Sequence, residues 1–92
     1  MKTTKRTELA KIWARFVKIM RDNCPSSSGL DALLNKDTTE VATWIVQMTS
    51  GDSAGDAQKV AKYIGVMYNL ETSVQDEIEQ IMLTSLVLCL NT

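Results

Sequence analysis

Residues 51–55 read GDSAG and fit the G-x-S-x-G pattern, in which the serine is the nucleophile of a hydrolase. That chemistry needs a histidine to take the serine proton and a large sheet to hold the turn. The chain has 92 residues and no histidine, so it supplies neither. We therefore interpret Ser53 as the N-cap of a helix and Gly51 as a turn residue after the preceding helix.

Metal chemistry is equally poorly supported by the residue types. The two cysteines, Cys24 and Cys89, are far apart, and without histidine they are too few for a zinc site. Asp76 and Glu79 are spaced for one helical face, but the Glu-x-x-His pairs of di-iron bundles need histidine. We expect no catalytic residue, no metal and no cofactor, and hence no enzyme. Two buried free thiols are favoured over a disulfide.

Positive charge is concentrated at the N-terminus. Residues 1–21 hold seven of the ten basic side chains and one carboxylate, for a net charge of +6, whereas residues 22–92 carry −7. Such asymmetry is typical either of a surface for an anionic partner or of a solvent-facing helix that complements the rest of the molecule. Both interpretations stay open.

Helical spacing pairs some of these charges with each other. Glu8 lies one turn from Lys11, and Lys18 lies one turn from Asp22, so we expect two ion pairs along the polar face. The remaining basic side chains are predicted to be unpaired and are candidate partner contacts. They are Lys2, Lys5, Arg6, Arg15 and Arg21.

Residues 57–80 resemble an imperfect helix-turn-helix, with Ala61, Gly65 and Val74 near the positions of its small residue, turn glycine and core apolar residue. The resemblance implies a nucleic-acid-binding regulator, most naturally a dimer. However, acidic residues 76, 77 and 79 on the would-be recognition helix would repel phosphates. We favour a Gly65 that allows close packing inside a helix, and nucleic acid is the less favoured partner.

The elements that carry these residues are predicted to be helices. Apolar residues recur with helical period, and 45% of the chain is apolar, enough for one core over residues 1–92. In the first helix Leu9, Trp13, Phe16 and Met20 share one face. Short loops imply antiparallel neighbours. We predict an all-α, compact antiparallel bundle of four long helices over residues 5–23, 38–50, 53–69 and 73–90, with a short helix near 29–36.

The end of the last predicted helix is apolar on nearly every side. Either it is the central helix of the bundle, or it presents a patch for a protein partner or for a second copy in a homo-oligomer. The residues concerned are Leu83, Leu86, Val87 and Leu90.

These patterns favour a small non-enzymatic interaction protein, a regulator, inhibitor or adaptor that binds a protein partner through helical surfaces. The alternatives are the nucleic-acid-binding regulator and a small structural subunit of a larger assembly, such as a viral one. The longest apolar stretch is about half a membrane span, and basic residues interrupt any signal-peptide core. We expect a cytoplasmic protein that does not bind membranes.

Overall fold

The structure, a computed structural model, describes residues 3–90, and within them the chain forms five helices and no strand. This confirms the predicted all-α bundle, and each helix boundary lies within two residues of the expected one. The helices are α1 (Thr3–Asn23), α2 (Ser28–Leu34), α3 (Thr38–Met48), α4 (Ser53–Met67) and α5 (Thr72–Leu90).

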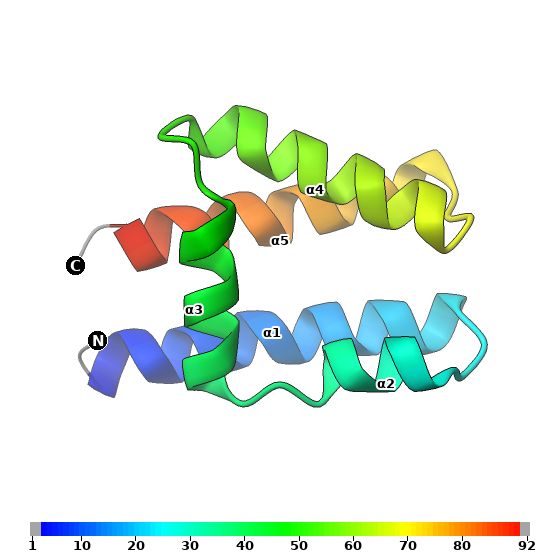
Figure 1. Ribbon diagram of the computed structural model, residues 1–92, viewed down its shortest axis with the longest axis horizontal. Coiled ribbons are helices and arrows are strands. Elements are labelled where there is room, and N and C mark those ends of the chain that lie inside the picture. The colour runs from blue at the N-terminus through cyan, green and yellow to red at the C-terminus, as the bar shows by residue number, and fades with distance from the viewer. Residues whose placement is uncertain (1–2, 91–92) are drawn as a thin grey trace.

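Helix α5 is the centre of the bundle, because it contacts α1, α3 and α4. Figure 1 shows α4 and α5 side by side and antiparallel, and α1 also runs opposite to α5. The short α2 folds back along α1. Helix α3 differs from the others, because it crosses α1 and α5 instead of lying alongside them (Figure 1). Because α3 crosses the bundle in this way, one side of the molecule is left open.

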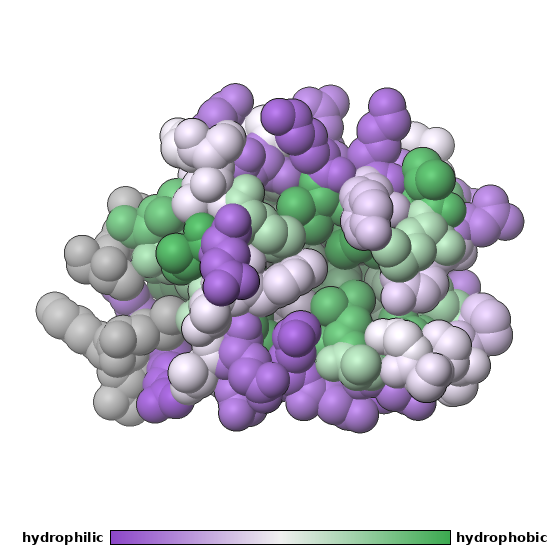
Figure 2. Space-filling view, viewed as in Figure 1, coloured by the Kyte–Doolittle hydropathy of each residue, from purple (hydrophilic) through white to green (hydrophobic). Residues whose placement is uncertain are grey.

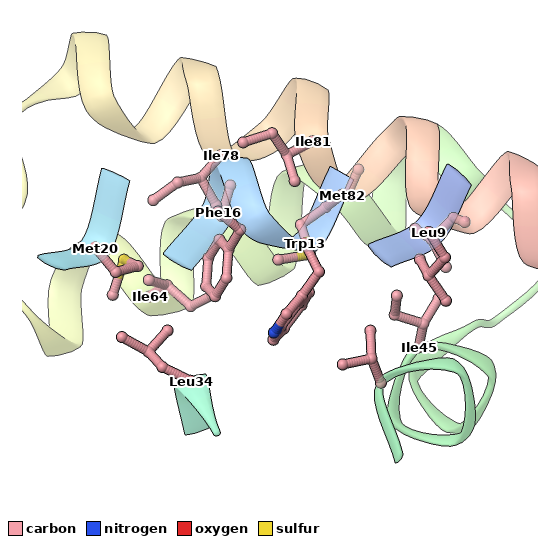
Figure 3. Packing of buried hydrophobic residues seen from close by; sticks show 14 of the residues in the cluster. Leu9, Trp13, Phe16, Met20, Leu34, Ile45, Ile64, Ile78, Ile81 and Met82 are labelled. Atoms are coloured by element: carbon pink, nitrogen blue, oxygen red, sulfur yellow. The ribbon is translucent and has the colours of Figure 1, made fainter. Parts of the chain in front are cut away.

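The core forms along the predicted face of α1. Leu9, Trp13, Phe16 and Met20 are buried, as predicted, and lie against apolar residues of α5 (Figure 3). The Trp13 ring lies 4.6 Å from that of Phe16 and makes an edge contact with Trp44 of α3 at 5.8 Å between centroids. The Trp13 indole N–H is buried without an acceptor among the described residues, so this side chain contributes through its apolar surface.

Carboxylates begin α3 and α4. A capping box begins α3: Asp37 Oδ1 accepts a hydrogen bond from the Glu40 amide at 2.8 Å, and Glu40 Oε1 accepts one from the Asp37 amide at 3.2 Å. For α4 the predicted cap was wrong. Gly51 takes a positive φ of 98° and leaves Asp52 extended, so that Asp52 is the N-cap and accepts from the Gly55 amide at 3.1 Å. Ser53 is the first helical residue.

A buried carboxylate fixes the connection between α3 and α4. Asp56, only 4% exposed, accepts hydrogen bonds from the Ser50 amide and the Ser50 hydroxyl, both at 2.7 Å. The Thr49 hydroxyl donates a third at 3.1 Å. The Ser50 hydrogen bonds hold the pKa of Asp56 below its usual value, although burial opposes this. The end of α3 is thereby tied to the first turn of α4.

Gly65 is a packing residue inside α4, as the sequence interpretation favoured. It is buried, and a Cβ at this position would lie 2.3 Å from Cδ of Gln75 in α5. The chain reverses after it, where Asn69 has a φ of 54° and the Leu70 amide donates to the Gly65 carbonyl at 2.8 Å. Gln75 Nε2 donates to the Leu70 carbonyl at 3.0 Å and closes the turn.

Candidate interaction surface

The basic face of α1 is largely engaged within the molecule. The two predicted ion pairs are confirmed, with Lys11 Nζ 3.6 Å from Glu8 and Lys18 Nζ 3.1 Å from Asp22. All four side chains are largely exposed, so each pair stabilises the fold only weakly.

The five basic residues predicted to be unpaired do not share one environment. Arg21 was wrongly placed among them, because Arg21 Nη1 lies 2.7 Å from Asp31 Oδ1 of α2. Spacing along α1 could not predict a partner that comes from the next helix. The Arg6 guanidinium donates to the Thr39 hydroxyl of α3, and Lys5 is half-buried near Cys89. Lys2 lies outside the described residues.

Arg15 is therefore the basic candidate that is exposed on α1 and has neither an ion pair nor a side-chain hydrogen bond within residues 3–90. The described candidates do not converge on one concentrated positive surface.

The arrangement of α4 and α5 differs from that of the helix-turn-helix which residues 57–80 resemble in sequence. Helices α4 and α5 lie side by side, whereas the two helices of a helix-turn-helix cross steeply (Figure 1).

The apolar candidates at the end of α5 divide into two pairs. Leu86 is 1% exposed and Leu83 is half-buried against the core, so both are structural residues of the central helix. Val87 and Leu90 are 44% and 41% exposed. The bundle therefore uses one side of this helix end and leaves the other side in solvent.

A mostly apolar groove is open on the surface of the bundle. It lies between α4 on one side and α2 and α3 on the other, and its volume is about 640 Å³. Figure 2 shows apolar side chains over the centre of this face, with hydrophilic ones along its edges. We call it the α3–α4 groove. Its lining residues are Leu33, Trp44, Met48, Lys59, Val60, Tyr63, Ile64, Met67 and Tyr68.

The groove is open because α4 packs on α5 and does not close onto α3. Ile64 faces the core, but Tyr63 and Met67 remain 65% and 51% exposed on the same side of α4. Trp44 and Met48 of α3 are half-buried and form the opposite wall. Large side chains from both walls thus face a space that no described residue fills.

The groove lining itself carries little charge. Lys59 of α4 is the single charged residue in the lining. Across the groove, Lys36 lies beside Trp44 in an adjoining depression of about 290 Å³. Glu40 lines that depression too, and its carboxylate, which accepts the capping hydrogen bond from Asp37, opposes the charge of Lys36. Negative charge is thus missing from the lining itself.

The sequence held a partial signal for this groove. Tyr63 and Val66 form a second apolar side of the third long helix, outside its main stripe. Met67, by contrast, shares the helical spacing of the buried residues Ala61 and Ile64, yet it is half exposed. Trp44 and Met48 likewise follow the core periodicity of α3. The sequence periodicity does not indicate the angle at which α3 crosses its neighbours.

The described residues contain no other site with recognisable chemistry. No three His, Cys, Asp or Glu side chains cluster as metal ligands within residues 3–90. Cys24 and Cys89 are both free, and burial raises the pKa of each thiol, which disfavours the reactive thiolate.

Comparison with known protein families, with curated proteins and with solved structures finds no match to this chain. None of the helices in residues 3–90 combines the length and the apolar character that crossing a bilayer requires.

Proposed function

We propose that this protein is a small interaction protein, a regulator, inhibitor or adaptor, that binds a protein partner in the α3–α4 groove. The observation that carries the proposal is an open space of about 640 Å³ with eight apolar or aromatic residues among its nine lining residues. A domain of this size gains from covering such a surface, since it has little buried area of its own.

The composition of the groove supports a protein partner. Methionine and aromatic residues are enriched in the centres of protein interfaces, and this lining holds two methionines and three aromatic residues. Methionine also adapts its shape to different apolar surfaces. Tyrosine and tryptophan supply much of the binding free energy in protein interfaces, and Tyr63 and Trp44 are both accessible from the groove.

The proposal is tested by affinity capture of the tagged protein from a native lysate, with and without nuclease, read by mass spectrometry. Tyr63→Glu places a charge in the groove at a side chain that is 65% exposed, so folding is expected to survive. Val87→Glu, at the exposed end of α5, is the matched control. Circular dichroism and thermal unfolding establish that both variants fold.

We expect Tyr63→Glu to lose the captured protein at least tenfold, and Val87→Glu to retain it. Loss with Val87→Glu alone would place the contact at the end of α5 and refute the groove. Capture that disappears on nuclease treatment would favour the nucleic-acid-binding alternative. A defined oligomer that forms from the purified chain and disappears with Val87→Glu would favour the structural subunit.

A further inference from the structure

We infer that Asp56 is a positioning residue for the α3–α4 groove, because it holds the end of α3 against the first turn of α4 and so sets the distance between the two walls. This inference rests on the proposed function and assigns a residue that controls the shape of the same site. Asp56 does not line the groove and acts on it through its neighbours in the two helices.

Asp56 lies at the end of the groove where the two walls are joined. Met48, the last lining residue of α3, directly precedes Thr49 and Ser50, which both donate hydrogen bonds to the Asp56 carboxylate. On α4, Asp56 shares a helical face with Val60, which lines the opposite wall one turn later. From this connection α3 and α4 run in different directions, and the groove opens between them (Figure 1).

The carboxylate is the strongest direct link between the two walls. Helix α4 packs on α5, whereas α3 packs on α5 and α1, and direct contacts between α3 and α4 are few. Both hydrogen bonds from Ser50 to Asp56 are 2.7 Å long and have a charged acceptor, which makes them stronger than neutral ones. Asp56 is only 4% exposed, so water competes little for its oxygens.

Loss of this link should change the groove without unfolding the bundle. Val41 and Ile45 are buried and hold the first turns of α3 in the core. Met48, in the last turn, is half-buried and has no such anchor. Without Asp56 the end of α3 would move relative to α4, and a partner would have to order the Met48 wall when it binds, which weakens binding.

The first measurement is the distance between the walls in the full-length protein. Nitroxide labels are attached at two exposed positions, through Gln47→Cys on α3 and Lys62→Cys on α4, with Cys24→Ser to remove the half-buried native thiol. We expect Asp56→Asn to broaden the pulsed-EPR distance distribution about twofold, because the amide replaces the charged acceptor. Asp52→Asn, which removes the neighbouring charge and keeps a capping side chain, should leave the distribution narrow.

The second measurement is the affinity for the protein captured in the experiment above. We expect Asp56→Asn and Ser50→Ala to weaken its binding about tenfold or less, and by more than Asp52→Asn does. Ser50→Thr keeps the hydroxyl donor and should restore both the affinity and the narrow distance distribution. A general loss of stability would not depend on that hydroxyl. Circular dichroism establishes that each variant is folded at the temperature of measurement.

The outcomes separate the inference from the proposed function. If Asp56→Asn leaves the distance distribution unchanged, or binds the captured protein as tightly as the original chain, the inference fails. The proposed function still stands in that case, provided that Tyr63→Glu loses the captured protein. If Tyr63→Glu captures that protein as well as the original chain does, the groove is not the binding site and the proposed function fails, whatever the distances show.

Discussion

Neighbouring residues near the end of α5 differ sharply in what they contribute to stability. Leu86 is 1% exposed, and its truncation to alanine leaves a cavity among core side chains, so we expect Leu86→Ala to cost about 2–5 kcal/mol of unfolding free energy. Val87 is 44% exposed, and Val87→Ala should change stability by no more than about 0.5 kcal/mol. Urea unfolding followed by circular dichroism measures both.

The same pair of variants reports on self-association. A large loss for Val87→Ala, growing with protein concentration, would mean that a second copy covers Val87 and would contradict its assignment as a free surface residue. Equal, small losses for both variants would contradict the central position of α5.

Asp56 predicts an acid-dependent component of stability. Its pKa in the folded protein lies below the ordinary value of about 3.9, chiefly because Ser50 donates two hydrogen bonds to the carboxylate. A depressed carboxyl pKa stabilises the fold above the unfolded-state value, and this stabilisation is lost as pH falls through the folded-state value. The loss is therefore expected below about pH 4.

The variant Asp56→Asn should lower the urea midpoint at pH 7. The neutral amide of asparagine would replace a charged carboxylate that accepts three hydrogen bonds. Its deficit relative to the original protein should shrink below pH 4. Asp52→Asn is the matched control, since it removes the same charge from the same helix end, and asparagine caps helices about as well as aspartate. A deficit for Asp56→Asn that is constant with pH would contradict the assigned pKa.

At the level of elements, the contact of α4 with α5 depends on Gly65. Alanine in place of glycine in a helix usually stabilises by about 0.5–1 kcal/mol. Here the new Cβ would lie 2.3 Å from Gln75 Cδ, so the Gln75 side chain must move and release the Leu70 carbonyl. Overpacking then outweighs the helix preference, and we expect Gly65→Ala to destabilise by about 1 kcal/mol.

The sign of that effect should reverse when Gln75 is truncated. In a Gln75→Ala background the obstacle is gone, and Gly65→Ala should stabilise by about 0.5–1 kcal/mol. Gly29→Ala in α2 is the control for helix preference alone, since nothing lies within 4 Å of its added Cβ. The unfolding free energies of the single and double variants measure this difference. If Gly65→Ala still destabilises the protein in the Gln75→Ala background, Gln75 is not the obstacle.

Sequence periodicity predicted the helices well because each one buries a stripe of its own. Leu9, Trp13, Phe16 and Met20 are all buried along α1, and the Asp37 capping box begins α3 as its spacing indicates. The cap of α4 was misplaced by one residue. The sequence pattern does not show which side chain the turn at Gly51 places next to the first backbone N–H groups of α4.

At the scale of the whole molecule, the groove was not predictable in the same way. It arises where α3 crosses the bundle and α4 packs mainly on α5, and a helical stripe does not specify which neighbour will cover it (Figure 1). Met67 shows the difficulty: its register places it with the core residues of α4, yet it is half exposed. The ion pair of Arg21 shows the same difficulty: spacing within α1 could not predict it, because its partner Asp31 lies in α2.

The overall arrangement also decides the behaviour of the two thiols. Cys24 follows the end of α1, and Cys89 lies in the last turn of α5, at the opposite end of a molecule 34 Å long (Figure 1). A disulfide needs Cα atoms within about 7 Å, so the folded chain cannot close one between them. We expect diamide oxidation to yield no intramolecular disulfide and only a slow covalent dimer through Cys24, the half-buried thiol.

Both thiol pKa values are raised by burial, so oxidation should quicken as pH rises from 7 to 9 and the thiolate fraction increases. Non-reducing gels and peptide mass spectrometry measure the product. Cys24→Ser should abolish the dimer, and Cys89→Ser, the matched control, should leave it intact because Cys89 is buried. An intramolecular Cys24–Cys89 bridge formed under native conditions would contradict the antiparallel placement of α1 and α5, on which the position of the groove also depends.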